Sequence, residues 1–273
     1  MALACSADDT HDDAATSLAP STETAASTTE ASGDAPDSST ADDASVSETG
    51  TDSATTDGAA EQDSTGIVHD VPEGVFLWTG SGGGGPGTDL HPDAVEQVLV
   101  DAGIEVGRGD VLPDDFADRF GTLVYLNPRE EFDLAVDSFA EQLVSAGGRL
   151  VLVMEHCKNG CWGNAAGHNA LLEQLGSTLR MHGDGGAPLA DTVLSIEPVV
   201  PLTDEVGELV VYYSGRVEVG TATALGTIPN GDVVIGWEAL GPGEVLAIAD
   251  SSMFGYRLQA ADNRQFVRNL AKH

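Results

Sequence analysis

The chain has 273 residues, of which 45 are acidic and 11 basic, and its formal net charge is -34. Residues 1–66 hold 15 acidic residues and no basic one, which leaves a net charge of -19 on the remainder. A field of this sign excludes nucleic acid as a partner, and the lack of any run of 18 apolar residues excludes a membrane-spanning helix.

Residues 1–66 have the composition of a disordered, acidic tether. They include no Lys, Arg, Phe, Trp or Tyr, while Ser, Thr, Ala, Asp and Glu recur without a period. Such a segment cannot bury enough apolar surface to offset the entropy lost on ordering. We therefore expect one folded domain over residues 67–273, on a tether that spans on the order of 40 to 45 Å as a flexible coil.

The segment Ala2-Leu3-Ala4-Cys5 resembles the lipobox of bacterial lipoproteins, in which small residues precede the cysteine that becomes acylated. It departs from the commonest form, because Ala2 stands where Leu is usual. The resemblance implies lipidation at Cys5, a membrane partner, and a cell-envelope location with the domain outside the cytoplasm. The apolar stretch of an export signal is missing before Cys5, which we attribute to a start codon assigned too far downstream. A chance cysteine in a disordered tail is the alternative.

The first half of the folded part alternates short apolar runs with amphipathic helices. Residues 75–78 predict a strand that a Gly-rich loop follows, and a helical pattern runs from Pro92 to Gly103. Its apolar side chains share one helical face: Val95, Val98, Leu99 and Ala102. The same alternation continues in strands over residues 104–106, 122–126 and 149–154 and in helices over 130–146 and up to Gly176. This order predicts a parallel sheet with helices on both faces.

After residue 192 the pattern becomes rich in short β-strands, separated by Ser-Gly, Asn-Gly and Gly-Pro-Gly turns. We expect an antiparallel or mixed extension that returns to the main sheet through residues 245–249. Asp262 and Gln265 have the spacing of a capping box and predict the start of a final helix. The fold class expected from these elements is α/β, with a mainly parallel sheet and a β-rich C-terminal extension.

The order of these elements resembles the class I glutamine amidotransferase-like superfamily, in its non-catalytic or uncharacterised branch. The segments that carry the resemblance are AGIEV, FAEQLVSAGGRLVLVMEH, HNALLEQLG, IADSSMF and DNRQFVRNL, within residues 75–270. It implies a flavodoxin-like three-layer sandwich for residues 67–273. The family's G-x-C-x-G elbow is displaced around Cys161. The last histidine before His273 is His182, so the final third lacks the family's His-Glu pair, and we expect no catalysis by this route.

Cys157 and Cys161 enclose three residues in the segment that follows the strand 149–154. In an oxidising compartment such a pair forms a disulfide, which is the state we expect. Two alternatives stay open: a zinc site that adds His156 and His168, whose spacing matches no standard zinc finger, and two free buried thiols. We predict no metal and no cofactor.

Three loops should meet at the carboxyl ends of the parallel strands, where doubly wound sheets bind ligands. The glycines of the first loop match the letters of the dinucleotide fingerprint, but a run of four glycines makes that match nearly automatic. Because the domain is acidic, we expect a small neutral ligand such as a sugar, or a cation, in preference to a nucleotide; a protein partner is the other possibility. The candidate ligand-binding residues are Gly82, Gly83, Thr88, Asp89, Glu155, His156, Asn164, Asp250, Ser251 and Ser252. The alternative is a surface loop and a capped turn without a ligand.

These observations predict a lipid-anchored envelope protein whose domain binds a ligand or partner without catalysis. The alternative is a degenerate thiol- or metal-dependent hydrolase centred on Glu155, His156, Cys161 and His168. The hydrolase requires those four side chains to share one cleft. In the binding protein, Cys157 and Cys161 are bonded to each other.

Overall fold

The computed structural model describes residues 71–80, 90–126, 134–158 and 163–273, with only the backbone of 134–137. All of them belong to the unit Asp63–His273. The predicted tether, including Cys5, lies outside the described residues. Among the helices that are described, none is both long and apolar enough to cross a bilayer.

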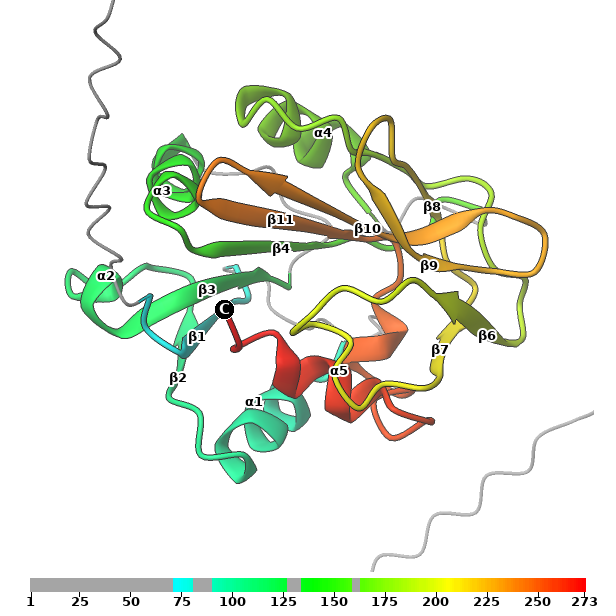
Figure 1. The fold of residues 1–273 in the computed structure, drawn as a ribbon, viewed down its shortest axis with the longest axis horizontal. Coiled ribbons are helices and arrows are strands. Elements are labelled where there is room, and N and C mark those ends of the chain that lie inside the picture. The colour runs from blue at the N-terminus through cyan, green and yellow to red at the C-terminus, as the bar shows by residue number, and fades with distance from the viewer. Residues whose placement is uncertain (1–70, 81–89, 127–133, 159–162) are drawn as a thin grey trace, which may run out of the picture. The chain divides into compact units, whose positions relative to one another are not determined.

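The described strands form one sheet of 11 strands, in which a parallel part joins an antiparallel part (Figure 1). The parallel part has the order β2, β1, β3, β4, β11, with bounds Val106–Gly109, Gly74–Trp78, Phe120–Tyr125, Arg149–Val153 and Gly243–Ile248. β11 pairs antiparallel with β10 (Val233–Leu240), which pairs with β9 (Thr223–Thr227), and β6 (Asp191–Ile196) and β7 (Leu209–Tyr212) follow. β8 (Arg216–Glu218) joins β10 to β5 (Arg180–His182).

The expected fold class, a mainly parallel flavodoxin-like sandwich, is wrong. Only the pairings among β2, β1, β3, β4 and β11 are parallel, and every other described pairing is antiparallel. The antiparallel strands β5 to β10 are therefore an integral part of one mixed sheet and not an extension of a parallel one. The predicted return of the chain to the parallel part is confirmed, since β11 pairs with β4 from Glu244 to Ile248.

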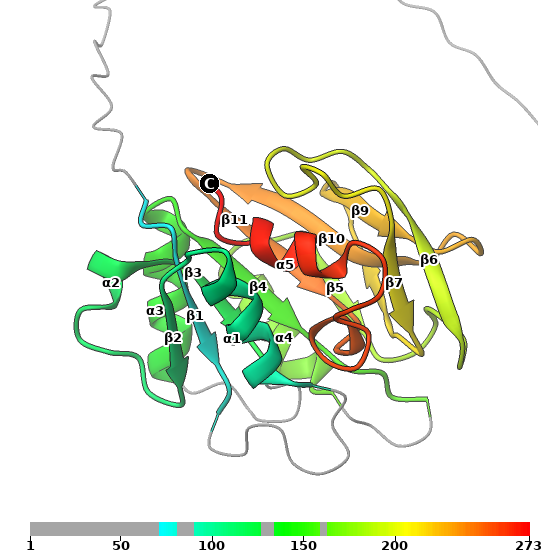
Figure 2. The same cartoon turned by 90° about the horizontal axis from the view of Figure 1, so that it is seen from below.

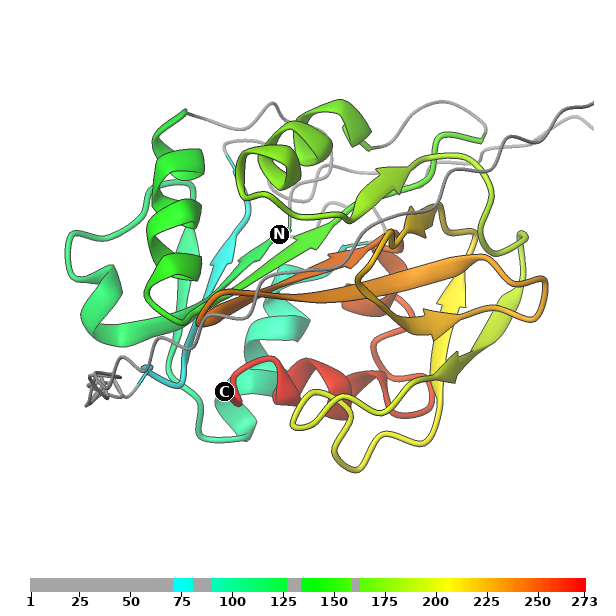
Figure 3. The ribbon, with the colours of Figure 1, turned by 45° about the horizontal axis from the view of Figure 1, so that its top comes forward.

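Helices cover both faces of the parallel part (Figure 3). α3 (Leu134–Ser145) and α4 (Ala165–Gln174) lie on one face, while α1 (Pro92–Asp101) and α5 (Asn263–Asn269) lie side by side on the other (Figure 2). The short α2 (Phe116–Arg119) precedes β3, and a 3-10 helix, η1 (Ser252–Phe254), follows β11. Alternating side chains of each parallel strand face opposite layers, because successive strand residues point to opposite sides of a sheet.

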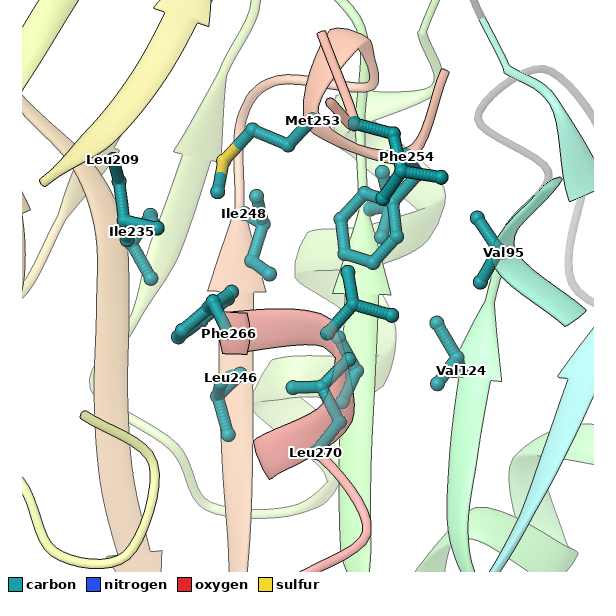
Figure 4. Packing of buried hydrophobic residues seen from close by; sticks show 14 of the residues in the cluster. Val95, Val124, Leu209, Ile235, Leu246, Ile248, Met253, Phe254, Phe266 and Leu270 are labelled. Atoms are coloured by element: carbon teal, nitrogen blue, oxygen red, sulfur yellow. The ribbon is translucent and has the colours of Figure 1, made fainter. Parts of the chain in front are cut away.

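The two buried clusters follow from this alternation. Beneath α1, α5 and η1, side chains such as Leu246, Ile248, Phe254 and Phe266 pack together (Figure 4). Opposite them, Leu123, Leu150 and Val245 pack beneath α3 and α4. Burial of this apolar surface holds the sheet and its helices together.

α1 ends where the sequence predicts. Gly103 has φ +79°, and its N–H donates to Val100 O at 2.9 Å while the N–H of Ile104 donates to Leu99 O at 3.1 Å. These two bonds make a Schellman motif, which needs a residue that tolerates positive φ. The predicted capping box of the last helix is wrong, because Asp262 Oδ2 instead accepts the N–H groups of Gly207 and Glu208 at 2.8 and 3.0 Å.

At the amino edge of the parallel strands, the fully buried Arg149 joins β4 to β11 and to the end of α5. Its Nε donates to Glu244 Oε1 at 2.6 Å, and its Nη atoms donate to carbonyls at the end of α5, including Lys272 O at 2.6 Å. Val71 and His273 both reach Gly121 at this edge, where a Cβ would lie 2.5 Å from Val71 Cγ1 and 3.0 Å from His273 Nε2.

Candidate functional site

The loops that follow β4 and β11 lie next to each other, because these two strands are parallel neighbours whose carboxyl ends meet at one edge. Glu155 stands two residues after β4 and Ser251 three residues after β11. The Ser251 hydroxyl donates to Glu155 Oε2, and the backbone N–H of His156 donates to Glu155 Oε1 at 3.0 Å. Both side chains are buried. Glu155 therefore joins the two loops.

Asp250 lies beside Glu155 and is fully buried. Its Oδ1 accepts the N–H of Ser252 at 2.6 Å, and its Oδ2 accepts the Ser252 hydroxyl and the N–H of Tyr212, each at 2.9 Å. Burial and the neighbouring charge of Glu155 raise the pKa of Asp250 to about 7, although these hydrogen bonds oppose the change. Asp250 connects the turn after β11 to the end of β7.

His156 and Lys158 face Tyr213, which follows β7. The imidazole centroid of His156 lies 4.1 Å from the Tyr213 ring centroid, and Lys158 Nζ lies 4.8 Å from the same centroid. Burial lowers the pKa of His156, and the charge of Lys158 lowers it further, so the imidazole is neutral at pH 7. Tyr213 has φ +53°, a conformation that costs a residue with a Cβ about 1 to 2 kcal/mol. The Tyr213 ring, on a strained backbone, therefore contacts both a neutral imidazole and a cation.

Tyr212 and Tyr256 extend the aromatic surface beside Asp250. Their ring centroids are 5.4 Å apart, and the Arg257 guanidinium carbon lies 5.1 Å from one ring and 4.6 Å from the other. Arg257 Nε donates to Asp191 Oδ1 at 2.5 Å, which holds the guanidinium against both rings. Tyr212, Tyr213 and Tyr256 are half-buried, so each still presents part of its surface to solvent.

Tyr125 and Trp78 end β3 and β1 at the same edge. They are stacked, with ring centroids 6.0 Å apart and planes 15° apart. With Tyr125 included, all four tyrosines of the chain lie at this edge. The Trp78 indole N–H is buried and has no hydrogen-bond partner within the part of the chain that the structure describes.

Asn164 and His168 have structural roles in α4. Asn164 Oδ1 accepts the N–H of Gly167 at 2.9 Å and caps the helix, while Asn164 O lies 2.7 Å from His168 Nδ1. His168 is completely buried, and burial lowers its pKa to about 4, against hydrogen bonds to the backbone of Asn164 and Val153. His168 is a neutral core histidine whose ring faces Tyr125, with centroids 6.1 Å apart.

The structure describes six of the ten predicted ligand-binding residues and brings five of them together: Glu155, His156, Asp250, Ser251 and Ser252. Gly82, Gly83, Thr88 and Asp89 lie outside the described residues. Cys157 is disulfide-bonded. Cys161, its expected partner, is outside the described residues, so the pairing stays a prediction. Among described residues, no group of three or more His, Cys, Asp or Glu side chains could hold a metal ion.

Sequence reasoning missed the three half-buried tyrosines, together with Lys158 and Arg257. The adjacent letters Tyr212-Tyr213 at the end of an apolar run were the available signal, since amphipathic rings at a strand end mark binding surfaces. The pattern could not show that β7 ends beside Asp250, because that contact depends on the order of strands in the antiparallel part.

A family model described as "Domain of unknown function (DUF4350)" matches residues 93–271, which is more than half of the chain. The chain belongs to the DUF4350 family. No curated protein matches this DUF4350 chain. The expected resemblance to the glutamine amidotransferase-like superfamily is wrong, since the family model and the structurally similar proteins point elsewhere.

The DUF4350 domain is similar to solved structures at low sequence identity, which shows a shared fold alone. The mmIFT52 N-terminal domain has a TM-score of 0.53 and 12% identity, over 73% of this chain and 98% of that one. Cytoplasmic Protein STM1381 from Salmonella typhimurium LT2 has a TM-score of 0.53 and 14% identity, over 72% and 98%. A β-galactosidase from Rahnella sp. R3 has a TM-score of 0.50 and 17% identity, over 73% and 30%. The chain spans only 35% of an exo-β-1,4-mannosidase from Opitutaceae bacterium strain TAV5.

Proposed function

We propose that this chain is a lipid-anchored cell-envelope protein whose DUF4350 domain binds a ligand without catalysing a reaction. The observation that supports binding is that two buried carboxyl groups, at the edge where the parallel strands end, accept hydrogen bonds from the surrounding loops. Glu155 accepts from His156 and Ser251, and Asp250 accepts from Tyr212 and twice from Ser252. These bonds order the loops that surround the edge, which is a pre-organised surface of the kind that ligands use.

The chemistry of this edge favours a small neutral ligand such as a sugar. Tyr212, Tyr213 and Tyr256 are half-buried and present aromatic ring surface to solvent, and such side chains give contact area at low entropic cost. The net charge of -34 disfavours an anionic ligand.

A thermal-shift screen of the full chain tests this ligand class. Neutral mono- and disaccharides are expected to raise the melting temperature, whereas phosphosugars, divalent metals and glutamine are not. Tyr213→Ala should abolish the shift, while Val200→Ala, at a residue that is 78% exposed, should retain it. A shift by phosphosugars alone, or one that survives Tyr213→Ala, would contradict the proposal.

The anchor rests on the lipobox-like segment and on the acidic tether that follows it. In cells that express the chain behind a bacterial export signal, the wild type should partition with membranes and Cys5→Ser should be released to the soluble fraction. A single acyl chain binds a membrane only weakly, so stable partition requires a second acyl chain or another membrane contact. Equal partition of both chains would remove the anchor.

One observation favours the alternative, an enzyme. Asp250, with a pKa of about 7 beside the Glu155 carboxylate, resembles the acid of an acid–base pair. The hydrogen bonds of Asp250 go to the chain itself, and its side chain is fully buried. Hydrolysis of aryl glycosides or of glutamine by the pure protein, lost in Asp250→Asn or in Cys161→Ala, would establish an enzyme and refute the binding proposal.

A further inference from the structure

A hollow lies at the amino edge of the parallel strands, away from the candidate site. It is a groove of about 540 Å³ between α2, α3 and the first residues of β3 and β4. Its floor is aromatic: the Phe116 ring centroid lies 4.5 Å from that of Phe139 and 5.3 Å from that of Phe120. A volume of this size is within the range that proteins use to bind small molecules or side chains, roughly 300 to 1,000 Å³.

One wall of the groove is the segment from which the chain enters the domain. Val71 and Pro72 line it and lie against Gly121, where a Cβ would come within 2.1 Å of Pro72 O. Val71 also approaches Gly147, since a Cβ there would lie 3.3 Å from Val71 Cγ2. Glycine at these positions lets the entering chain lie close to the sheet, directly beside the aromatic floor.

Two apolar residues, Ile67 and Val68, lie just after the tether and are separated from this wall only by His69 and Asp70. Ile67 and Val68 precede Val71 by four and three residues, and residues 47–66 contain no Val, Ile, Leu, Met or aromatic residue. Four residues of extended chain span about 13 Å, which is enough to cross a groove one helix wide. Exposed to water, these two β-branched side chains would forgo a burial free energy that the adjacent groove offers.

We propose that the groove formed by Phe116, Phe120, Phe139 and Leu143 is a docking site for Ile67 and Val68 of the same chain. The docked pair joins the end of the tether to the domain and fixes the direction in which the tether departs. Asp118, at the exposed rim, argues against an anionic occupant such as a fatty acid, whereas an uncharged aliphatic pair meets no such repulsion. This inference uses a different edge of the domain from the proposed ligand site and does not depend on it.

The test compares full-length chains by thermal unfolding and by methyl NMR. The double variant Ile67→Asp, Val68→Asp should lower the melting temperature by about 3 to 6 °C, because two buried aliphatic side chains are lost. Val46→Asp is the control, since it adds a carboxylate at the nearest upstream Val, Ile or Leu of the tether and should leave the melting temperature unchanged. In the wild type, the Ile67 methyl resonance should be shifted upfield by the phenylalanine rings.

The groove itself supplies the second arm of the test. Ala146→Trp, at an exposed position on the rim, should fill the groove and return the Ile67 methyl to its random-coil position. 1-Decanol should raise the melting temperature of the double Asp variant more than that of the wild type. The proposal is overturned if the double variant melts like Val46→Asp, if the Ile67 methyl has a random-coil shift in the wild type, or if decanol stabilises both chains equally.

Discussion

Replacement of Asp250 by Asn keeps the size of the side chain and removes its charge. The wild-type carboxyl group accepts three hydrogen bonds, two of them on Oδ2, and both of its oxygens can still accept when it is protonated, as it is in the folded protein at pH 5. An amide has one acceptor oxygen, so at least one buried donor, such as the N–H of Tyr212, loses its partner. At pH 5 we therefore expect Asp250→Asn to lower the free energy of unfolding by about 1 to 3 kcal/mol.

A rise in pH should destabilise the wild type more than Asp250→Asn. Burial and the Glu155 charge raise the pKa of Asp250 from 3.8 to about 7. Between these values the folded protein holds a proton that the unfolded chain releases, so stability is highest at low pH and falls as the pH rises toward 7. From pH 5 to pH 8 this contribution lowers the free energy of unfolding of the wild type by about 2 to 3 kcal/mol, at about 1.4 kcal/mol per pH unit inside the window. The variant lacks that loss, so its deficit should shrink or reverse by pH 8.

Urea unfolding at pH 5, 6, 7 and 8 measures the difference between the two chains. The other titrating groups are common to both and cancel in the difference. Asp262→Asn is the control, because hydrogen bonds from Glu208 and Gly207 lower the pKa of Asp262, so it stays charged throughout this range in both states. If the wild type and Asp250→Asn show the same slope with pH, the account of a buried, proton-holding carboxyl is refuted.

Three further predictions concern stability and the thiols. Arg149→Met should lower the free energy of unfolding, measured in urea, by about 3 to 5 kcal/mol, because Glu244 and the carbonyls at the end of α5 lose a buried cationic donor. An effect below 1 kcal/mol would contradict this role of Arg149. Burial lowers the pKa of His168 to about 4, so wild-type stability should fall as the pH drops from 6.5 toward 4, and His168→Gln should show about 2 to 3 kcal/mol less of that loss; parallel acid curves would refute it. Alkylation of the unlipidated chain, read by mass, should label one thiol without reductant and three with it, and labelling of all three without reductant would exclude the disulfide.

Local sequence signals were sufficient for the parallel part of the fold. The apolar run in β1 and the i, i+3, i+4, i+7 pattern of α1 report burial directly, and Gly103 reports a helix end because few other residues accept its φ of +79°. β2 begins at Val106, two residues after the predicted start, which reflects how weakly a short strand marks its own boundary.

The antiparallel part could not be placed from local signals, and this is why the fold class was wrong. β10 pairs with β11 on one side and with β9 and β8 on the other, and these contacts depend on long-range pairing. β6 is largely exposed, so its side chains carry little of the alternation that would reveal its face or its neighbours.

In the candidate site too, some contacts were predictable from the sequence and others were not. The approach of Ser251 to Glu155 was predictable, because both follow parallel strands whose carboxyl ends share an edge. Asn164 was assigned to the ligand, but it caps α4, since an Asn directly before a helix serves that role whatever else lies nearby. The positive φ of Tyr213 has no signature in the letters, because it is imposed by the packing of its surroundings.

The meeting of Val71 and His273 at Gly121 has a practical consequence for engineering. Domains whose two ends lie close together tolerate insertion into a loop of a host protein and circular permutation. A host chain that receives residues 71–273 as an insert would join them at the amino edge of the parallel strands, opposite the edge that carries Glu155 and Asp250. The loops that carry those residues would remain open to whatever molecule is offered to them.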